Sequence, residues 1–355
     1  MKVLILSVGD QRNISLISLY TEYFDKNNIS YELVCMNRYG SEQIKYNNCK
    51  QFLYNCKIDS NWPKYKKIKP FINFRKFAKN IIKKNHYDFI VVWGENTMFL
   101  FSDYLIKSKI KYCANIRDVD YPKNILFKKL FDLVIKKASF VTWCVPRKPK
   151  FFEKYALTTM LSQNLKVLKN CNKKKELQSK NSPIRISWIG KLQYPDEDKK
   201  IIKAFGNDDR YIIQYFGMGA ENLKGFVDKN NYKNVHLYGT FAPEETGQFL
   251  EMTDVINAYY GTETYQIEYA SPIKFGYSSY LYIPALVTPN TYLADVIKKY
   301  KFGFVASNLD TLADDFYNWY HNNSFKKLKK ECEKYNDYIK KTNDKFYNIC
   351  DKNFK

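Results

Sequence analysis

Short apolar runs alternate with longer amphipathic segments over the first 145 residues of the chain. Five runs have the length and apolar character of buried strands, at 2–8, 31–36, 88–93, 112–116 and 140–145. The segments between them place apolar residues at helical spacing and predict helices over 14–26, 71–84, 97–107 and 124–137. Strands that alternate with helices form a parallel sheet with crossover helices. The pattern therefore predicts one doubly wound α/β domain over residues 1–170.

A second series of the same kind follows a polar interruption. The sequence turns polar between about residues 165 and 181, with three consecutive lysines and the start of a Ser-Lys-Asn-Ser-Pro run, and we expect the linker there. Further strand-like runs lie at 184–189, 211–216, 235–238, 255–259, 285–287 and 303–305, which predicts a second doubly wound domain over 181–323. Apolar residues near helical spacing predict a helical tail over 324–355. A chain of 355 residues is long enough for two cores.

The composition is that of a globular protein kept in a reducing compartment. Hydrophobic residues make up 45% of the chain, and its eight cysteines form no CxxC pair, so we expect them to be reduced and buried. The first eight residues are too short for a signal peptide and lead directly into Gly9-Asp10. No run approaches the roughly 20 apolar residues that span a bilayer. These features predict a cytoplasmic protein, with a peripheral position on the inner face of the membrane as a further possibility.

The positive charge is confined to one half of the sequence. Residues 1–180 hold 35 Lys and Arg against 14 Asp and Glu, whereas residues 181–355 hold 23 against 22. A lysine-rich codon bias would act on both halves alike. The asymmetry therefore predicts an anionic partner for the N-terminal half.

Four glycines and one lysine mark the candidate ligand site of the second half. Gly190, Gly217, Gly219 and Gly239 each follow a predicted strand, where a glycine permits close approach of the backbone to a ligand. Ser271-Pro272 opens a short helix whose free amides suit a phosphate group. A lysine in the first turn opposes the helix dipole unless an anion is present, although Lys274 can also be a solvated surface residue.

In this region the sequence resembles the C-terminal domain of GT-B glycosyltransferases. It is most similar to family 4 and to the related galactofuranosyl and glucosyl transferases of surface polysaccharide synthesis. Their donor-binding run has a Pro-x-Lys and, further on, a proline before a strand, and Pro272, Lys274 and Pro284 stand at matching spacings. Gly190-Lys191-Leu192 resembles the family's Gly-Arg/Lys-Leu. The resemblance covers about residues 184–315 and keeps the order of the motifs.

The resemblance implies two Rossmann-like domains facing a cleft and transfer of a hexose from a nucleotide diphosphate sugar, here a UDP-sugar. It implies a retaining reaction without a metal, with the nucleotide sugar as co-substrate and no cofactor. Lys191, Lys274 and nearby amides would stabilise the departing diphosphate. The implied donor-binding residues are Gly190, Lys191, Gly217, Gly219, Gly239, Glu268, Ser271, Pro272, Ile273, Lys274 and Tyr277. The sequence departs from the family at Tyr277, where an acidic residue holds the ribose, so that contact could shift to Glu268 or Glu263.

Acceptor contacts are expected at the strand ends of the first half. The candidates are Asp10, Arg12, Glu95, Asn96, Arg117 and Asp118. We select Asp118 to orient the acceptor as a catalytic residue, although an Asp at this place also caps a following helix or turn. Asp118-Val119-Asp120 also has the Asp-x-Asp form that holds a divalent metal in the other glycosyltransferase fold, GT-A. That reading leaves the repeated pattern of the second half without a role.

Residues 64–84 combine nine Lys and Arg with Tyr65, Phe71, Phe74 and Phe77. Such a helix suits an anionic membrane surface. The same basic residues could also attract a lipid-linked or other glycan acceptor that carries phosphate. An ordinary helix with its phenylalanines in the core fits equally well. Basic charge with aromatics also suits nucleic acid, but no binding motif accompanies it and no nucleic-acid partner is expected. A sugar-nucleotide epimerase is a further alternative. The absence of GxGxxG after the first strand argues against an epimerase with bound NAD.

Overall fold

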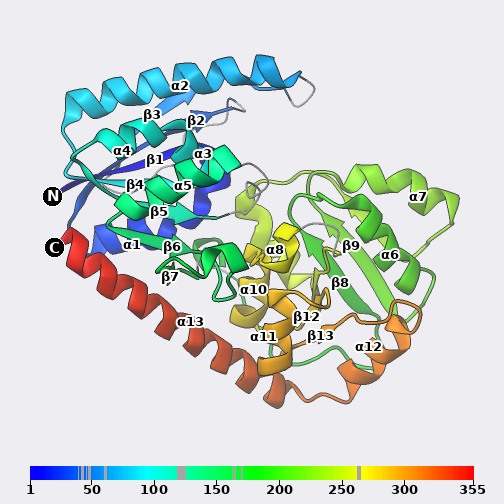
Figure 1. Ribbon diagram of the computed structural model, residues 1–355. Coiled ribbons are helices and arrows are strands. Elements are labelled where there is room, and N and C mark those ends of the chain that lie inside the picture. The colour runs from blue at the N-terminus through cyan, green and yellow to red at the C-terminus, as the bar shows by residue number, and fades with distance from the viewer. Residues whose placement is uncertain are drawn as a thin grey trace. The chain divides into compact units, whose positions relative to one another are not determined.

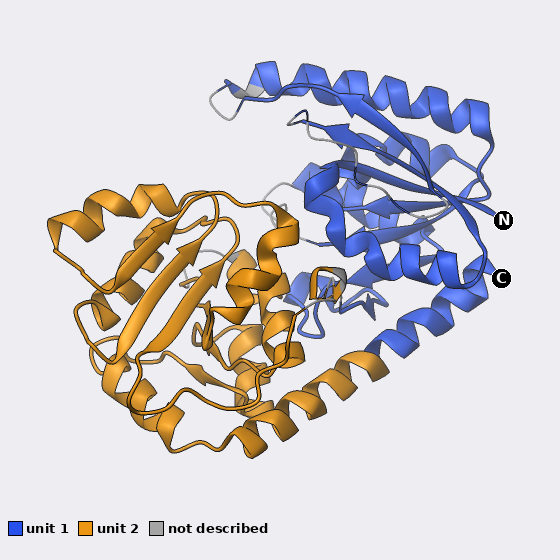
Figure 2. Ribbon diagram, turned by 180° about the vertical axis from the view of Figure 1, so that it is seen from behind, with its two compact units in different colours: residues 1–162, 342–355 blue, residues 163–341 orange. Residues whose placement is uncertain are grey.

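The computed structural model describes the chain except residues 39, 41–43, 45, 47–48, 60–61, 118–124, 162, 164, 169–170 and 262–264, and the side chains of 64, 166 and 265. The chain divides into two compact units, which are coloured separately in Figure 2. Unit 1 comprises residues 1–162 and 342–355, and unit 2 comprises residues 163–341. Each unit contains one parallel sheet with helices, so the predicted α/β class is confirmed.

The sheet of unit 1 has the strand order β3-β2-β1-β4-β5-β6-β7, with all neighbours parallel. Its strands are β1 Lys2–Asp10, β2 Ser30–Asn37, β3 Cys49–Asn55, β4 Phe89–Trp93, β5 Lys111–Ile116, β6 Phe140–Trp143 and β7 Thr158–Thr159. The central strands are buried almost throughout, as the apolar runs in the sequence predict. The chain moves outward from β1 through β2 to β3 and then returns to β4, so β1 and β4 form the switch point of this sheet.

The helices of unit 1 follow the predicted order with three differences in their limits. They are α1 Ser18–Lys26, α2 Lys64–Asn85, α3 Glu95–Leu100, α4 Ser102–Lys107 and α5 Ile125–Lys137, with 3-10 turns at Gln11–Ile17 and Lys150–Phe152. The segment expected as one helix over 97–107 breaks at Phe101, whose backbone is not helical (φ −109°, ψ 10°) and whose ring is fully buried. The helix expected at 71–84 begins at Lys64, and the one expected at 14–26 begins as a 3-10 turn.

The sheet of unit 2 has the order β10-β9-β8-β11-β12-β13 and is also parallel. Its strands are β8 Ile184–Ile189, β9 Tyr211–Phe216, β10 Val235–Tyr238, β11 Val255–Ala258, β12 Ala285–Val287 and β13 Gly303–Val305. Its helices are α6 Pro195–Phe205, α7 Lys224–Lys229, α8 Thr246–Glu251, α9 Tyr265–Glu268, α10 Ile273–Leu281, α11 Tyr292–Tyr300 and α12 Leu312–His321, with 3-10 turns at Leu165–Leu168, Ala220–Leu223 and Pro243–Glu245. All six predicted strands are present, and β8 and β11 form the switch point.

The C-terminal helix α13 (Phe325–Phe354) belongs to both units (Figure 1). Its first part packs in unit 2, where the Tyr335 ring stacks on Phe302 at 5.2 Å between centroids. Its end packs in unit 1, where Phe346, Cys350 and Phe354 are part of the hydrophobic core. The sequence suggests a separate tail over 324–355, but in the structure residues 342–355 complete the core of unit 1.

All eight cysteines are free, and five of them are buried. Burial raises the pKa of Cys35 and Cys113 to about 12, so these thiols stay protonated at neutral pH. Among the helices that the structure describes, none has a stretch that is long and apolar enough to cross a membrane.

Candidate functional site

The glycine loops of unit 2 meet beyond the carboxyl ends of its central strands. Gly190 follows β8 with φ +119°, and Gly217 follows β9 with φ +135°. A Cβ atom on Gly217 would collide with the carbonyl oxygen of Gly190, so the two backbones lie in direct contact. The amide of Gly217 donates to the carbonyl oxygen of Gly239 at 3.1 Å, which brings in the loop after β10. Gly219 (φ +96°) faces Leu192 in the same cluster. The structure thus places the four predicted glycines together, at the edge where doubly wound sheets bind ligands.

Lys274 extends from the first turn of α10 to the switch point of unit 2. Its side chain is buried, and its Nζ lies 2.8 Å from the centroid of the Trp188 ring and 4.8 Å from that of Tyr260. Trp188 is the second-last residue of β8 and donates from Nε1 to the carbonyl oxygen of Gly190 at 3.1 Å, so the amine is beside the glycine cluster. The Nζ has no hydrogen-bond partner among the described residues. Burial lowers the pKa of Lys274 well below its ordinary value, and the charge of Asp198 opposes this shift.

Two buried carboxylates near Lys274 were not selected from the sequence. Glu197 and Asp198 lie in the first turn of α6 and are each 2% exposed. Neither oxygen of the Asp198 carboxylate has a hydrogen-bond partner among the described residues. Burial raises the pKa of Asp198 to about 7, while the Lys274 charge lowers it. Glu197 accepts a hydrogen bond from Lys200 at 2.6 Å and is packed against Gly261, whose φ is +73°. A run of acids after a glycine loop is an ordinary helix start, so the sequence offered only a weak signal for this pair.

The other residues predicted to bind the donor differ in how far they are exposed. Lys191 is exposed in the loop after β8. Ser271, Pro272 and Ile273 lead into α10 and are half-buried, as is Glu268 at the end of α9. Tyr277 is buried in a hydrophobic cluster with residues that include Phe216, Ile256 and Leu281, so its ring contributes to packing. Glu263 lies outside the described residues.

In unit 1 the predicted carboxylates hold the loops that carry arginines. The fully buried Asp10 accepts hydrogen bonds from the backbone amides of Arg12 at 2.9 Å and Arg38 at 2.6 Å. Buried Glu95 likewise accepts from the backbone amide of Arg117 at 2.9 Å. Both acids thus fix the positions of the loops after β1, β2 and β5. Asn96 is exposed at the start of α3, and Asp118 and Asp120 lie outside the described residues.

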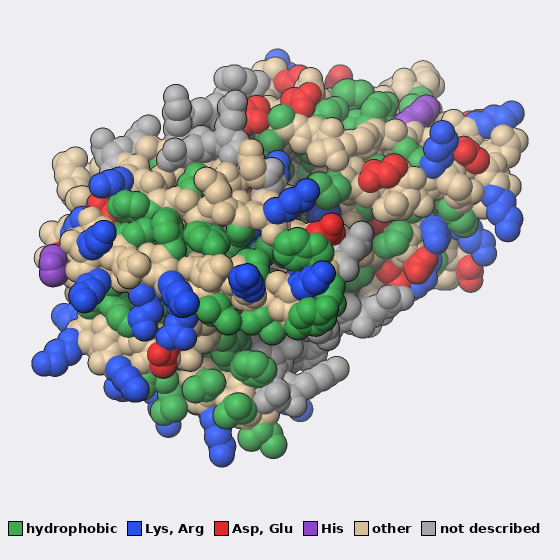
Figure 3. All heavy atoms as spheres, turned by 90° about the horizontal axis from the view of Figure 1, so that it is seen from above, with side chains coloured by type: hydrophobic (Ala, Val, Ile, Leu, Met, Phe, Trp, Pro, Cys, Tyr) green, Lys and Arg blue, Asp and Glu red, His purple; other side chains and the backbone are tan. Residues whose placement is uncertain are grey.

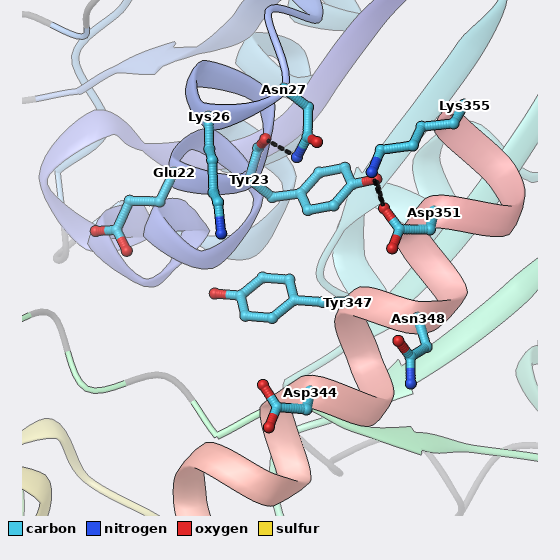
Figure 4. Close-up of a pocket in the computed structure, with 9 residues that line it drawn as sticks. All are labelled: Glu22, Tyr23, Lys26, Asn27, Asp344, Tyr347, Asn348, Asp351 and Lys355. Atoms are coloured by element: carbon cyan, nitrogen blue, oxygen red, sulfur yellow. Dashed lines mark hydrogen bonds and ion pairs between the residues drawn. The ribbon is translucent and has the colours of Figure 1, made fainter.

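Unit 1 also has two surface grooves, one at the amino end of β2 and one at the carboxyl end of β3. One, of about 510 Å³, lies between the end of α1 and the end of α13 (Figure 4). There Tyr23 donates to Asp351 at 2.7 Å and stacks on Tyr347. Because α1 ends just before β2 begins, this groove is at the amino end of that strand, opposite the edge where such sheets bind ligands. The other, of about 420 Å³, is lined by residues around the start of α2, which include Tyr54, Trp62 and Lys66.

The helix α2 has one buried face and one exposed face of mixed character. Phe74 and Ala78 are fully buried against the unit 1 core. On the other side Tyr65, Ile68 and Ile72 are 70%, 54% and 47% exposed, among the lysines of the same helix. Figure 3 looks down on α2 and shows blue Lys and Arg side chains with apolar side chains between them. The helix therefore combines core packing with an exposed basic and apolar surface.

No family model matches the sequence, and no curated protein matches it either. The structure, however, is similar over nearly its whole length to solved structures. A glycosyltransferase from Rickettsia africae is 13% identical, with a TM-score of 0.68 over 100% of this chain and 98% of that chain. Anabaena HepE, in complex with UDP and glucose, is 9% identical, with a TM-score of 0.67 over 99% of both chains. A UDP-N-acetylglucosamine 2-epimerase is 12% identical, with a TM-score of 0.58 over 94% of this chain and 90% of that chain.

These similarities establish the fold, which is GT-B: two parallel-sheet units, each with its own switch point, and a C-terminal helix shared by both. The predicted fold class is confirmed, and the GT-A alternative built on Asp118 and Asp120 is not favoured. At 9–13% identity the similarity says nothing of which residues act. The assignment of roles rests on the geometry of this chain.

Proposed function

We propose that this protein is a glycosyltransferase. It binds a nucleotide diphosphate sugar, a UDP-sugar, in unit 2 and transfers the hexose to a lipid-linked or surface glycan acceptor bound by unit 1. The observation that carries this proposal is the buried amine of Lys274, which has no hydrogen-bond partner among the described residues and lies beside Gly190 at the switch point. An amine kept out of water at this edge is suited to an anion that arrives with the substrate.

The proposed chemistry uses charge rather than a general base. When the bond between the sugar and the diphosphate breaks, negative charge grows on the diphosphate. A fixed ammonium stabilises this charge more strongly in a site shielded from water. Lys274 supplies the ammonium, the first turn of α10 supplies backbone amides, and the rings of Trp188 and Tyr260 exclude water. The leaving phosphate then accepts the proton of the acceptor hydroxyl, in a retaining reaction that needs neither a metal nor a cofactor beyond the nucleotide sugar.

The protonation of Lys274 is linked to the donor in this scheme. Burial lowers its pKa when the site holds no anion, and an entering diphosphate raises it again because opposite charges favour the ionised amine. Donor binding is therefore accompanied by proton uptake. Burial raises the pKa of Asp198, beside this amine, to about 7. An entering diphosphate disfavours its ionised form, so Asp198 takes up a proton as well.

The proposed place of action is the inner face of the cell membrane, in polysaccharide or capsule synthesis. The exposed face of α2, with Tyr65, Ile68 and Ile72 among lysines, supports this position. Co-sedimentation with vesicles tests it. Vesicles with anionic lipid should bind the protein, and those of neutral lipid alone should bind it weakly; equal binding to both would contradict the electrostatic part of the proposal.

A thermal-shift panel of UDP, GDP, CMP and UDP-sugars, with and without EDTA, tests the donor site. We expect one nucleotide to stabilise the protein equally in both conditions. No shift with any nucleotide would contradict the proposal. Because a structural neighbour is an epimerase, UDP-sugars are also incubated with the protein and analysed by NMR. An epimerised sugar nucleotide without an acceptor would point to that reaction instead, whereas hydrolysis to UDP and free sugar would support transfer.

A further inference from the structure

Two arginines at the strand ends of unit 1 each have a buried guanidinium nitrogen without a hydrogen-bond partner among the described residues. They are Nε of Arg38, after β2, and Nη1 of Arg117, after β5. Buried polar groups are nearly always hydrogen-bonded, and an unsatisfied one costs free energy. Two such nitrogens at the ligand-binding edge of one sheet therefore require an explanation.

The two guanidinium groups contact neighbouring strands of the sheet, and that of Arg38 also lies over the Phe71 ring of α2, 5.1 Å from its centroid. Arg38 donates from Nη2 to the carbonyl oxygen of Val8 on β1. Arg117 lies over the ring of Trp93 on β4, 5.2 Å from its centroid. The strands β1 and β4 are neighbours, with Ser7 paired to Trp93 near their carboxyl ends. The arginines thus follow β2 and β5, the strands that flank β1 and β4, and extend over this central pair, which forms the switch point.

Among the described residues, the nearby carboxylates bond the backbone of these arginines and not their guanidinium groups. Asp10 accepts the backbone amides of Arg12 and Arg38 and lies 3.9 Å from Nε of Arg12. Glu95 accepts the backbone amide of Arg117. Within the described part of the chain, neither Arg38 nor Arg117 forms an ion pair. The acids therefore act as positioning residues that hold the arginines in place while leaving their charge available.

A phosphate group matches this arrangement. It carries up to two negative charges and several oxygens, and the planar fork of a guanidinium binds such oxygens through paired hydrogen bonds. The excess of basic residues in 1–180 would draw an anion toward this unit. A neutral sugar would offer no counterion to these two half-buried arginines.

We propose that the acceptor is phosphorylated and that Arg38 and Arg117 hold its phosphate beyond the carboxyl ends of β1 and β4. This inference rests on the proposed transferase function, because it names the substrate class of the acceptor side. A soluble sugar phosphate and a lipid-linked sugar phosphate present the same chemistry to the two arginines.

Calorimetric titration of the full chain, with UDP present in saturating amount, tests this site. The probes are glucose 6-phosphate, farnesyl diphosphate in detergent micelles, and glucuronate and glucose as unphosphorylated controls. We expect a phosphorylated probe to bind and the controls not to bind. Stronger binding of the micellar probe would assign a lipid-linked acceptor, and stronger binding of the soluble one a sugar phosphate.

Arg38→Gln and Arg117→Gln should each weaken the phosphate probe at least about tenfold, since each removes a charge-assisted hydrogen bond. Arg75→Gln is the matched control, because Arg75 is paired with Asp103 on the surface of the same unit, and it should bind like wild type. Arg38→Lys and Arg117→Lys should each retain more affinity than the glutamine variant at the same position, which a purely structural role would not require. Circular dichroism and the Tm verify that each variant is folded.

The outcomes separate the two proposals. If UDP binds but no phosphorylated probe does, or if both glutamine variants bind the probe like wild type, the phosphate site is refuted and the transferase proposal stands. If UDP and the UDP-sugars fail to bind while the probe still requires Arg38 and Arg117, the transferase proposal fails and the anion site remains.

Discussion

Replacement of Lys274 by methionine should make the protein more stable without nucleotide and less responsive to it. The Nζ of Lys274 is buried without a hydrogen-bond partner among the described residues, which costs about 1–3 kcal/mol. Its contact with the Trp188 ring returns about 0.5–2 kcal/mol if the amine is charged. Methionine has a similar length and keeps an apolar contact with the ring. At pH 6, where Asp198 holds its proton because burial raises its pKa to about 7, the net gain should be about 1 kcal/mol, or a rise of about 2–4 °C in Tm for a unit of this size.

The nucleotide should have the opposite effect. At a UDP concentration of about 100 times its Kd, ligand binding stabilises the wild type by about 2.7 kcal/mol. Loss of a charge-assisted bond to the diphosphate, worth about 1.5–3 kcal/mol, should weaken binding by roughly 100-fold. At the same UDP concentration the variant would then gain only about 0.4 kcal/mol. The order of the two melting temperatures should therefore reverse when UDP is added.

Differential scanning fluorimetry with and without UDP measures both effects on one plate. Lys203→Met is the control, because Lys203 is exposed on α6 and should change neither value. A Lys274→Met variant that is less stable than wild type and still gains the full stabilisation from UDP would refute the reasoning. It would mean that the lysine is a structural residue and that the diphosphate binds elsewhere.

Three further predictions concern stability. In the Lys274→Met background, Asp198→Asn should be more stable than its parent at pH 8 and equal to it near pH 4. Burial raises the Asp198 pKa to about 7 in the wild type, and loss of the Lys274 charge, which lowers it, should raise it further. The unfolded state loses this proton near 3.8, so the parent loses up to about 1.4 kcal/mol per pH unit as the pH rises from 3.8 to the folded-state pKa. A difference independent of pH in urea titrations would contradict this. Gly217→Ala should lower the free energy of unfolding by more than about 1 kcal/mol, because its φ is +135° and the new Cβ would collide with the Gly190 carbonyl. Gly225→Ala is the control: it lies in open space on α7 and should be neutral or slightly stabilising in the same urea unfolding experiment. Asp254→Asn should cost about 2 kcal/mol of stability, because the buried carboxylate accepts two hydrogen bonds from the Arg185 guanidinium, at 2.7 Å each. The pairing with Arg185 lowers the Asp254 pKa, so this contribution should be lost as the pH falls below about 3.8. An equal loss of stability at pH 3 and pH 7 would count against this prediction.

The regular elements were largely predictable because most of them are long or deeply buried. Central strands such as β1 and β4 are buried on both faces and appear as continuous apolar runs. The strand β3 was missed because it is only partly buried and its residues show no clear apolar run. The strand β7 has two residues, too few for any pattern. The break between α3 and α4 was missed because Phe101 continues the helical spacing of apolar residues while its backbone leaves the helix.

The candidate site was predictable only where one segment carries the signal. The glycines after β8 and β9 and the lysine at the start of α10 are visible in the sequence, because each is part of a local motif. The burial of Lys274, its contact with Trp188 and its proximity to Asp198 join positions more than 70 residues apart in the chain. Local patterns carry no information about such pairs.

The same distinction holds in unit 1. The sequence by itself determined the alternation of strands and helices, the place of the positive charge and the polar residues at the strand ends. Only the tertiary structure decided that Asp10 and Glu95 hold backbone amides, and that Arg38 and Arg117 extend over β1 and β4 from opposite sides. The physical reason is that a parallel sheet orders its strands differently from the chain. Side chains that follow β2 and β5 reach neighbouring strands only after the crossovers have set that order.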